Sequence, residues 1–184
     1  RYRYVTGVQT CALPISGRQM TLIFGDSKGA DAKIMQKYIR GSELKGAPAL
    51  VDLDGDRLAE ILFTDEGALC VLKFNTADNK LDFFWSEEAP WLALSGVPNQ
   101  DPVVVQNPGG NPSLVVALSA GSNLYGVNPL QRDRDMRQIW QNSKLAGSVA
   151  TSLTVIPRQN QAAILALADN SKNVWLINSA TGMS

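Results

Sequence analysis

Residues 48–75 read Pro-Ala-Leu-Val-Asp-Leu-Asp-Gly-Asp-Arg-Leu-Ala-Glu-Ile-Leu-Phe-Thr-Asp-Glu-Gly-Ala-Leu-Cys-Val-Leu-Lys-Phe-Asn. Three apolar runs, Leu50–Leu53, Glu60–Thr64 and Leu69–Phe74, are separated by turns that contain Asp-Gly or Glu-Gly. Each run is too short for a helix, and the turns have the chemistry of β-hairpins. With the run Leu81–Trp85 that follows, this stretch predicts four antiparallel strands.

The same arrangement recurs along the chain. The spacing is 54 residues for Pro48 and Pro102, 55 for Leu69 and Leu124, 55 for Trp85 and Trp140, and 50 for Leu124 and Val174. A period of this size is typical of propellers or solenoids. Because the hairpin turns favour pairing within each unit, a β-solenoid is the less favoured alternative.

These observations predict an all-β fold, an incomplete β-propeller domain over residues 17–184 built from four-stranded antiparallel blades. About three and a half blades are expected: a half-blade at 17–45, a blade at 47–90, a blade at 101–145 and an incomplete blade at 150–184. The missing blades of the same chain are then expected partners, since each blade must pack against neighbours.

Residues 1–16 are expected to lie outside the fold. Residues 5–15, Val-Thr-Gly-Val-Gln-Thr-Cys-Ala-Leu-Pro-Ile, resemble one translated reading frame of a sequencing adapter. The segment lacks the long apolar run of a signal peptide. We therefore interpret residues 1–16 as an artefactual, disordered segment, with the native N-terminus and any signal peptide missing.

Composition excludes several classes of function. Hydrophobic content is 45% and charged content 18%, which is ordinary for a globular domain. Basic and acidic residues number 17 each, and setting Arg1 and Arg3 aside leaves 15 against 17. A balance of this kind is not the basic footprint of a nucleic-acid-binding protein, and no apolar run approaches the ~20 residues of a membrane span.

The usual apparatus of catalysis is absent from the sequence. The chain has no histidine, which is the commonest general base and transition-metal ligand. Apart from Cys11, Cys70 is the only cysteine, and its place in an apolar run predicts a buried strand residue. No catalytic residue is expected.

Two repeat families resemble parts of the chain. Residues 51–62, Val-Asp-Leu-Asp-Gly-Asp-Arg-Leu-Ala-Glu-Ile-Leu, are similar to the aspartate-rich turn of FG-GAP/VCBS propeller repeats. Residues 173–182 and 123–128 resemble the strand and turn of quinoprotein-like (PQQ-like) repeats. Residues 48–74 are also loosely similar to a blade of the C-terminal propeller of type IV pilus tip adhesins.

The acidic turn is the candidate metal site. Asp52, Asp54, Asp56 and Glu60 occupy positions 1, 3, 5 and 9, and the backbone carbonyl of Leu58 lies at position 7. Carboxylates at alternate positions of a tight turn can aim several oxygens at one Ca²⁺, which would have a structural role. In the alternative, Asp52 and Asp54 only cap backbone N–H groups of a solvated hairpin. The FG-GAP/VCBS resemblance implies an aspartate at the ninth position, where this chain has Glu60.

Other candidate sites are weaker. The equivalent turns, residues 107–112 and 157–160, lack acids, so at most one calcium site is expected. Tryptophans at matching positions favour packing between blades over a ligand surface. They are Trp85, Trp91, Trp140 and Trp175.

The resemblances imply a non-enzymatic binding, adhesion or scaffold propeller of an exported bacterial protein. Its ligand, a protein or a carbohydrate, is expected at one propeller face. One alternative is a fragment of a propeller enzyme, either a PQQ-like dehydrogenase or a hydrolase or lyase. The other is a periplasmic scaffold for assembly of outer-membrane proteins. A PQQ site needs residues from all blades, and this chain does not supply them.

Overall fold

The computed structural model describes residues 9–15, 19–25, 33–38, 47–65, 67–78, 80–86, 91–98 and 100–184, with side chains from residue 47 onward. Strands dominate this part of the chain. Its one helical element is the 3₁₀ turn η1 (Arg134–Met136), so no described helix is long enough to cross a membrane. The all-β class predicted from the sequence is therefore correct.

The strands form successive antiparallel sheets in chain order. The first sheet has the order β1 (Gln9–Ile15), β2 (Gln19–Gly25), β3 (Lys33–Tyr38). The second is built from β4 (Ala49–Val51), β5 (Glu60–Asp65), β6 (Ala68–Asn75) and β7 (Lys80–Phe83). In addition, β8 (Trp91–Ala93) pairs with the beginning of β6, beside β7, so two short strands share this edge.

The third sheet has the order β12-β11-β10-β9, from β9 (Val103–Gln106), β10 (Leu114–Ala120), β11 (Asn123–Val127) and β12 (Gln138–Asn142). The fourth contains β13 (Thr154–Arg158), β14 (Gln161–Ala168) and β15 (Val174–Asn178). Strands pair within each sheet, as the hairpin turns predicted, and not between sheets. None of the described sheets closes on itself, and the propeller arrangement stays a prediction.

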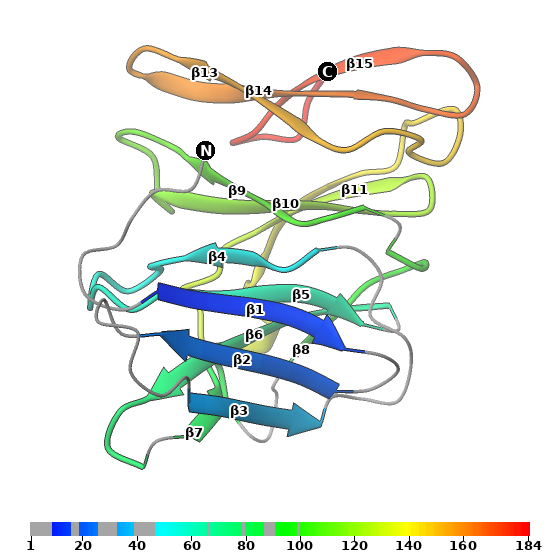
Figure 1. The fold of residues 1–184 in the computed structure, drawn as a ribbon. Coiled ribbons are helices and arrows are strands. Elements are labelled where there is room, and N and C mark those ends of the chain that lie inside the picture. Colours follow the sequence, from blue (N-terminus) through cyan, green and yellow to red (C-terminus); the bar gives the residue numbers. More distant parts are fainter. Residues whose placement is uncertain are drawn as a thin grey trace.

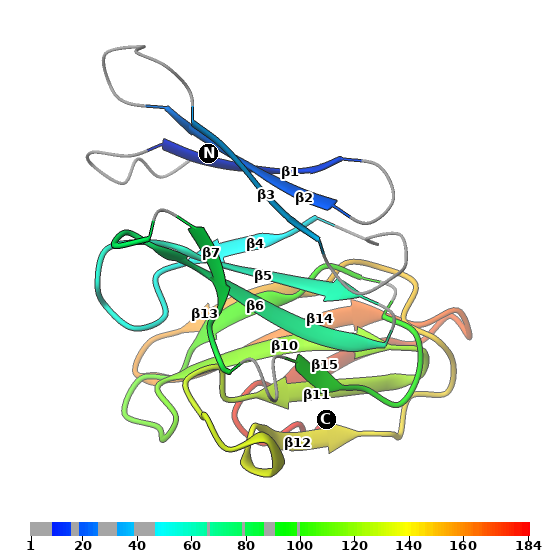
Figure 2. The same cartoon turned by 90° about the horizontal axis from the view of Figure 1, so that it is seen from below.

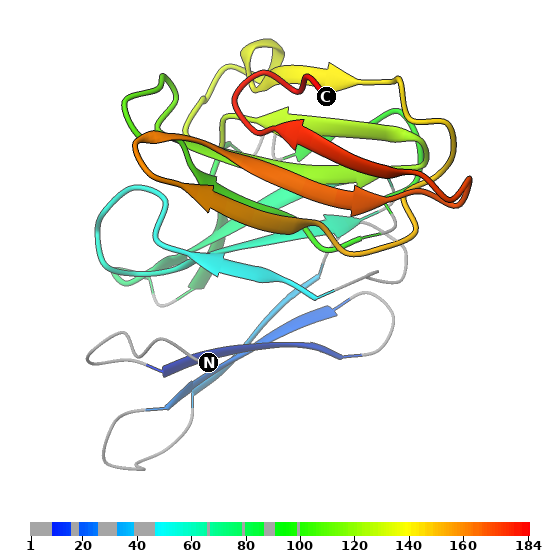
Figure 3. The same cartoon turned by 90° about the horizontal axis from the view of Figure 1, so that it is seen from above.

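The sheets are stacked face to face (Figures 1 and 2). The second sheet lies between the first and the third, and the fourth covers the other face of the third. Seen from above, β13, β14 and β15 lie nearest the viewer (Figure 3). Because the middle sheets are covered on both faces, their inner strands β6 and β10 are largely continuous apolar runs and do not alternate with polar residues.

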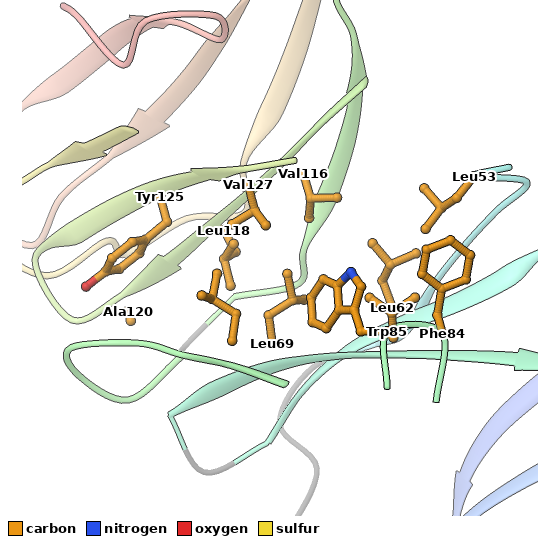
Figure 4. Packing of buried hydrophobic residues seen from close by; sticks show 12 residues of the cluster. Leu53, Leu62, Leu69, Phe84, Trp85, Val116, Leu118, Ala120, Tyr125 and Val127 are labelled. Atoms are coloured by element: carbon orange, nitrogen blue, oxygen red, sulfur yellow. The ribbon is translucent and has the colours of Figure 1, made fainter. Parts of the chain in front are cut away.

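Two apolar cores hold the described sheets together. One joins the second and third sheets through residues such as Leu62, Leu69, Val116 and Leu118 (Figure 4). The other joins the third and fourth sheets through residues such as Val115, Leu124, Leu165 and Ile177. A third cluster, which includes Ile61, Phe63, Cys70, Leu72 and Leu81, occupies the opposite face of the second sheet. Cys70 is thus the buried strand residue that was expected.

A tryptophan links each of these sheet pairs. Trp85 follows β7, and its indole Nε1 donates to the carbonyl of Pro129 at 2.8 Å, just beyond β11 of the next sheet. Trp140 on β12 donates in the same way to the carbonyl of Ser179 at 2.9 Å, just beyond β15. Both indoles are buried. These two tryptophans therefore pack between sheets.

Two expectations need correction. The segment 1–16 was expected to be disordered, but residues Gln9–Ile15 form β1, paired with β2 along its whole length. The pairing shows that these residues form a strand. That the segment derives from an adapter stays a prediction. The strand expected at 50–53 ends at Val51, because Asp52 accepts two backbone hydrogen bonds that bend the chain into a turn.

Candidate functional site

The candidate site is the turn between β4 and β5. It brings carboxylate oxygens of Asp52, Asp54 and Glu60 within 4.8 Å of one another, the one such acidic group among the described residues. Asp52 and Asp54 are exposed, whereas Glu60 is buried as the first residue of β5. Strand pairing fixes the base of the turn, because Glu60 lies opposite Val51 on β4. We call these three residues the acidic cluster.

Backbone hydrogen bonds shape the turn. Asp52 accepts from the N–H of Gly55 at 2.7 Å through Oδ1 and from the N–H of Arg57 at 3.0 Å through Oδ2. Asp54 accepts from the N–H of Asp56 at 3.3 Å. Gly55 has a φ of 82°, which glycine adopts without strain. Arg57 has a φ of 72°, a left-handed conformation that costs a non-glycine residue about 1–2 kcal/mol.

The capping role proposed for Asp52 and Asp54 as the alternative to calcium is therefore present. These bonds do not use all the carboxylate lone pairs, since an ionised carboxylate offers about four acceptor sites. Capping and metal binding are compatible in this turn.

Glu60 is the residue of the turn whose surroundings most favour a bound cation. Its Oε2 accepts from the N–H of Leu53 at 2.7 Å, but its Oε1 is buried and has no hydrogen-bond partner. Burial, together with the nearby charges of Asp54 and Asp56, raises the pKa of the Glu60 carboxyl to about 7. A buried carboxylate oxygen that lacks a partner is costly, and a bound cation would remove that cost.

Lys73 on β6 supplies a cation that the sequence analysis missed. Its Nζ lies 2.5 Å from Oδ2 of Asp54 and 2.8 Å from Oδ2 of Asp56. These carboxylates raise the pKa of Lys73, and its ammonium lowers the pKa of Asp56. The signal in the sequence was a lysine inside an otherwise apolar strand. The register pairs Ile61 with Leu72, so Lys73 lies one step further, across from Glu60.

The predicted ligands thus divide into two groups. Asp52, Asp54 and Glu60 come together in the acidic cluster. Asp56 lies outside it, because its Oδ1 accepts from the N–H of Leu58 at 2.8 Å and its Oδ2 from Lys73. The role of the Leu58 carbonyl stays a prediction.

The equivalent turns of the third and fourth sheets frame a cleft of about 540 Å³. Its walls carry amide side chains, including Asn107, Asn111, Asn160 and Gln161, with Arg158 as the charged residue. A Cβ at position 110 would lie 2.0 Å from the Asn107 amide nitrogen, so a side chain there would displace this amide from its hydrogen bond to the Pro112 carbonyl. This amide cleft and the acidic cluster lie on the same side of the stack, where the β4–β5, β9–β10 and β13–β14 turns gather (Figure 1).

The other two tryptophans have different surroundings. Trp175 is partly buried, and its Nε1 donates to Oδ2 of Asp169 at 2.8 Å. Asp169 also accepts from the backbone N–H of Ser171 and of Asn173, and these hydrogen bonds lower its pKa. Trp91 packs against the third apolar cluster, on the face of the second sheet opposite the third sheet. Both are thus placed within the structural framework of their sheets.

Comparison with known proteins adds no relative. The scan against protein-family models gave no match, and the searches of curated proteins and of solved structures found no similar protein.

Proposed function

We propose that this chain is part of a β-propeller that serves as a non-enzymatic binding module and holds one structural Ca²⁺ in the acidic cluster. The observation that carries the calcium proposal is Glu60, whose buried Oε1 without a partner belongs to the same cluster as Asp52 and Asp54. Ca²⁺ takes six to eight oxygens, and several of these can be water at an exposed turn. The exported bacterial context implied by the sequence resemblances would provide the calcium.

The propeller proposal is supported by the way the sheets meet. The Trp85–Pro129 and Trp140–Ser179 hydrogen bonds join successive sheets at corresponding places. A propeller places successive antiparallel sheets face to face in this manner, usually four to eight of them around an axis. Loops at one face of such a ring generally provide recognition.

The amide cleft is the proposed ligand site. Its volume lies within the range of small-molecule pockets, about 300–1,000 Å³. Amide groups donate and accept hydrogen bonds at once, which suits the hydroxyls of a carbohydrate or the backbone of a peptide. The dehydrogenase and assembly-scaffold alternatives remain predictions without a structural observation in their favour.

Thermal unfolding with and without calcium tests the metal proposal. At a calcium concentration about 100 times its Kd, binding stabilises the folded chain by about 2.7 kcal/mol. For a chain of this size that corresponds to an increase in Tm of roughly 5–10 °C. Asp54→Asn should remove the increase, whereas Asp78→Asn, in the exposed β6–β7 turn, should keep it. A Tm that does not respond to calcium would refute the proposed site.

Binding to immobilised glycans and peptides tests the amide cleft. We expect Arg158→Gln and Asn160→Ala to weaken any binding, because both side chains line the cleft. Lys80→Gln, on the second sheet, should bind like the wild type. Binding that these cleft variants leave intact would place the ligand elsewhere.

A further inference from the structure

Turns of the third and fourth sheets form most of the wall of the amide cleft. The β9–β10 turn is closed by a hydrogen bond from the N–H of Asn107 to the carbonyl of Ser113 at 2.8 Å. The β13–β14 turn is bounded by Arg158 and Gln161, which lie opposite each other in the register of this hairpin. In the turn after β15, the carbonyl of Asn178 accepts from two backbone N–H groups. The side chains that line the cleft are therefore carried by hydrogen-bonded backbone.

Arg158 is the charged residue of this cleft, and its guanidinium is positioned but not neutralised. Its Nε donates to the carbonyl of Ala162 at 2.7 Å, across the β13–β14 turn. With the residues that the structure describes, its two terminal nitrogens form no hydrogen bond or ion pair. The described residues that line the cleft include no aspartate or glutamate. The remaining four of the five guanidinium N–H groups are thus available to a ligand.

Two other side chains of the cleft use their oxygens to accept hydrogen bonds from the backbone. Oδ1 of Asn178 accepts from the N–H of Ala180 at 2.9 Å, so its Nδ2 is the end of the amide that can still donate. Oγ1 of Thr181 accepts from the N–H of Met183 at 3.3 Å, which leaves its hydroxyl hydrogen for another acceptor. The other amides of the cleft can donate and accept equally. The free hydrogen-bonding capacity of the cleft is therefore weighted towards donors.

We propose that the amide cleft binds a carbohydrate that carries a carboxylate, a uronic acid, and that Arg158 binds this carboxylate. The inference rests on the proposed function, which makes the cleft the ligand site. An ionised carboxylate only accepts hydrogen bonds, and its two oxygens match the planar fork of a guanidinium. The hydroxyls of the sugar then bind the amides, each of which can serve a hydroxyl as donor or as acceptor. A ligand of this kind matches both the single positive charge and the excess of donors.

The walls of the cleft favour a sugar over an acidic peptide. Extended peptides are commonly recognised by a sheet edge, to which they add as a further strand through regularly spaced backbone groups. Here the side chains of turns form most of the wall instead. Ile139 on β12, which is 36% exposed, also lines the cleft and offers an apolar contact to the C–H groups of a sugar ring. Charge, amides and an apolar side chain thus share a cleft of about 540 Å³.

Calorimetric titration of the full 184-residue chain with matched pairs of ligands tests the proposal. The probes are short oligomers of galacturonic, glucuronic and mannuronic acid, each compared with its neutral methyl ester. For at least one pair, the chain should bind the acid about 10-fold more tightly than the ester, as expected for charge-assisted hydrogen bonds. Arg158→Gln should remove this preference. Because Arg158 is exposed, the unfolding midpoint of the variant should match that of the wild type.

Arg132→Gln is the matched control. Arg132 is also an exposed arginine, but it lies between β11 and β12 and does not line the cleft, so this variant should keep the preference.

Several results would overturn the proposal. Equal affinity for acid and ester in every pair would do so while leaving the cleft as a site for neutral ligands. A preference that persists in Arg158→Gln or is lost in Arg132→Gln would place the anion elsewhere. Tighter binding of an end-blocked tri-glutamate peptide than of every glycan would assign the cleft to peptides. Binding of no probe would exclude uronic acids, whereas the cleft variants on immobilised glycans and peptides decide separately whether the cleft is a ligand site.

Discussion

The guanidinium carbon of Arg137 lies 4.1 Å from the centre of the Trp85 ring. Arg137 is fully buried, and its nitrogens donate to the carbonyls of Gln131, Arg132 and Trp91. The Trp85 indole meanwhile donates to Pro129, so this one ring meets the third sheet through both its face and its edge. The contact fixes the segment between β11 and β12 against the second sheet. A desolvated cation over an aromatic face contributes about 2 kcal/mol.

Replacing Trp85 with phenylalanine should therefore destabilise the chain. The phenyl ring keeps much of the apolar contact, but the buried carbonyl of Pro129 loses its donor, at a cost of about 1–3 kcal/mol. Urea unfolding measures this change in the free energy of unfolding. Trp140→Phe removes the corresponding bond to Ser179 and should have a similar effect. Two variants as stable as the wild type would show that these hydrogen bonds do not hold the sheets together.

Gly126 should not tolerate a side chain while Trp140 is present. A Cβ on Gly126 would lie 2.1 Å from the Trp140 ring, and overpacking of this kind costs about 1–3 kcal/mol. Gly126→Ala should therefore lower the free energy of unfolding. In a Trp140→Leu background the same change should cost less, because the ring that it meets is gone. Equal costs in the two backgrounds would contradict the packing described for this tryptophan.

Glu60 should make the metal-free chain less stable as the pH rises. Its pKa in the folded chain is about 7, above the ordinary 4.5, so between these values the folded state holds a proton that the unfolded state has released. The contribution of Glu60 to the free energy of unfolding is therefore greatest below pH 4.5. It decreases by about 3 kcal/mol as the pH rises through 7. Unfolding in the presence of a chelator measures this effect. Glu60→Gln should flatten this part of the pH profile, and an unchanged profile would argue against the assignment.

Lys73 should compete with calcium for the acidic turn. Its ammonium contacts Asp54, which is also a proposed calcium ligand. The ammonium and a calcium ion would therefore compete for the same carboxylate. Lys73→Gln should increase calcium affinity by roughly 3–10-fold, as removal of an exposed ion pair changes binding by about 1 kcal/mol. Calorimetric titration provides the measurement. Lys80→Gln is the matched control, because Lys80 bridges Asp78 and Asp82 away from the cluster. Equal affinity in both variants and the wild type would exclude competition.

The secondary structure was largely predictable from the sequence. Short apolar runs between Gly-, Asn- and Asp-containing turns are sufficient to define hairpin strands, and β5, β6, β10 and β14 lie where these runs predicted them. The errors occurred where side chains compete with strand pairing, as at Asp52, whose carboxylate ends β4. The strand at 9–15 was missed because those residues were set aside on the basis of their resemblance to an adapter.

The candidate site was predictable only in part. The spacing of Asp52, Asp54 and Glu60 indicated a turn with converging carboxylates, because alternate positions of a tight turn face the same point. Lys73 lies on a strand beyond the turn, and only the pairing of β5 with β6 brings it to the acids. Likewise, burial of Glu60 and its raised pKa depend on the packing around β5.

The amino-acid pattern alone determined that this chain forms antiparallel hairpins, where their strands lie, and which turn carries the acids, because these features follow from local turn chemistry and the period of apolar residues. Tertiary structure decided which faces are covered. Leu69, Leu124 and Val174 occupy matching places in the sequence, yet two are buried and the third is exposed. The difference arises because burial depends on whether another sheet lies opposite, and a local pattern carries no information about that neighbour.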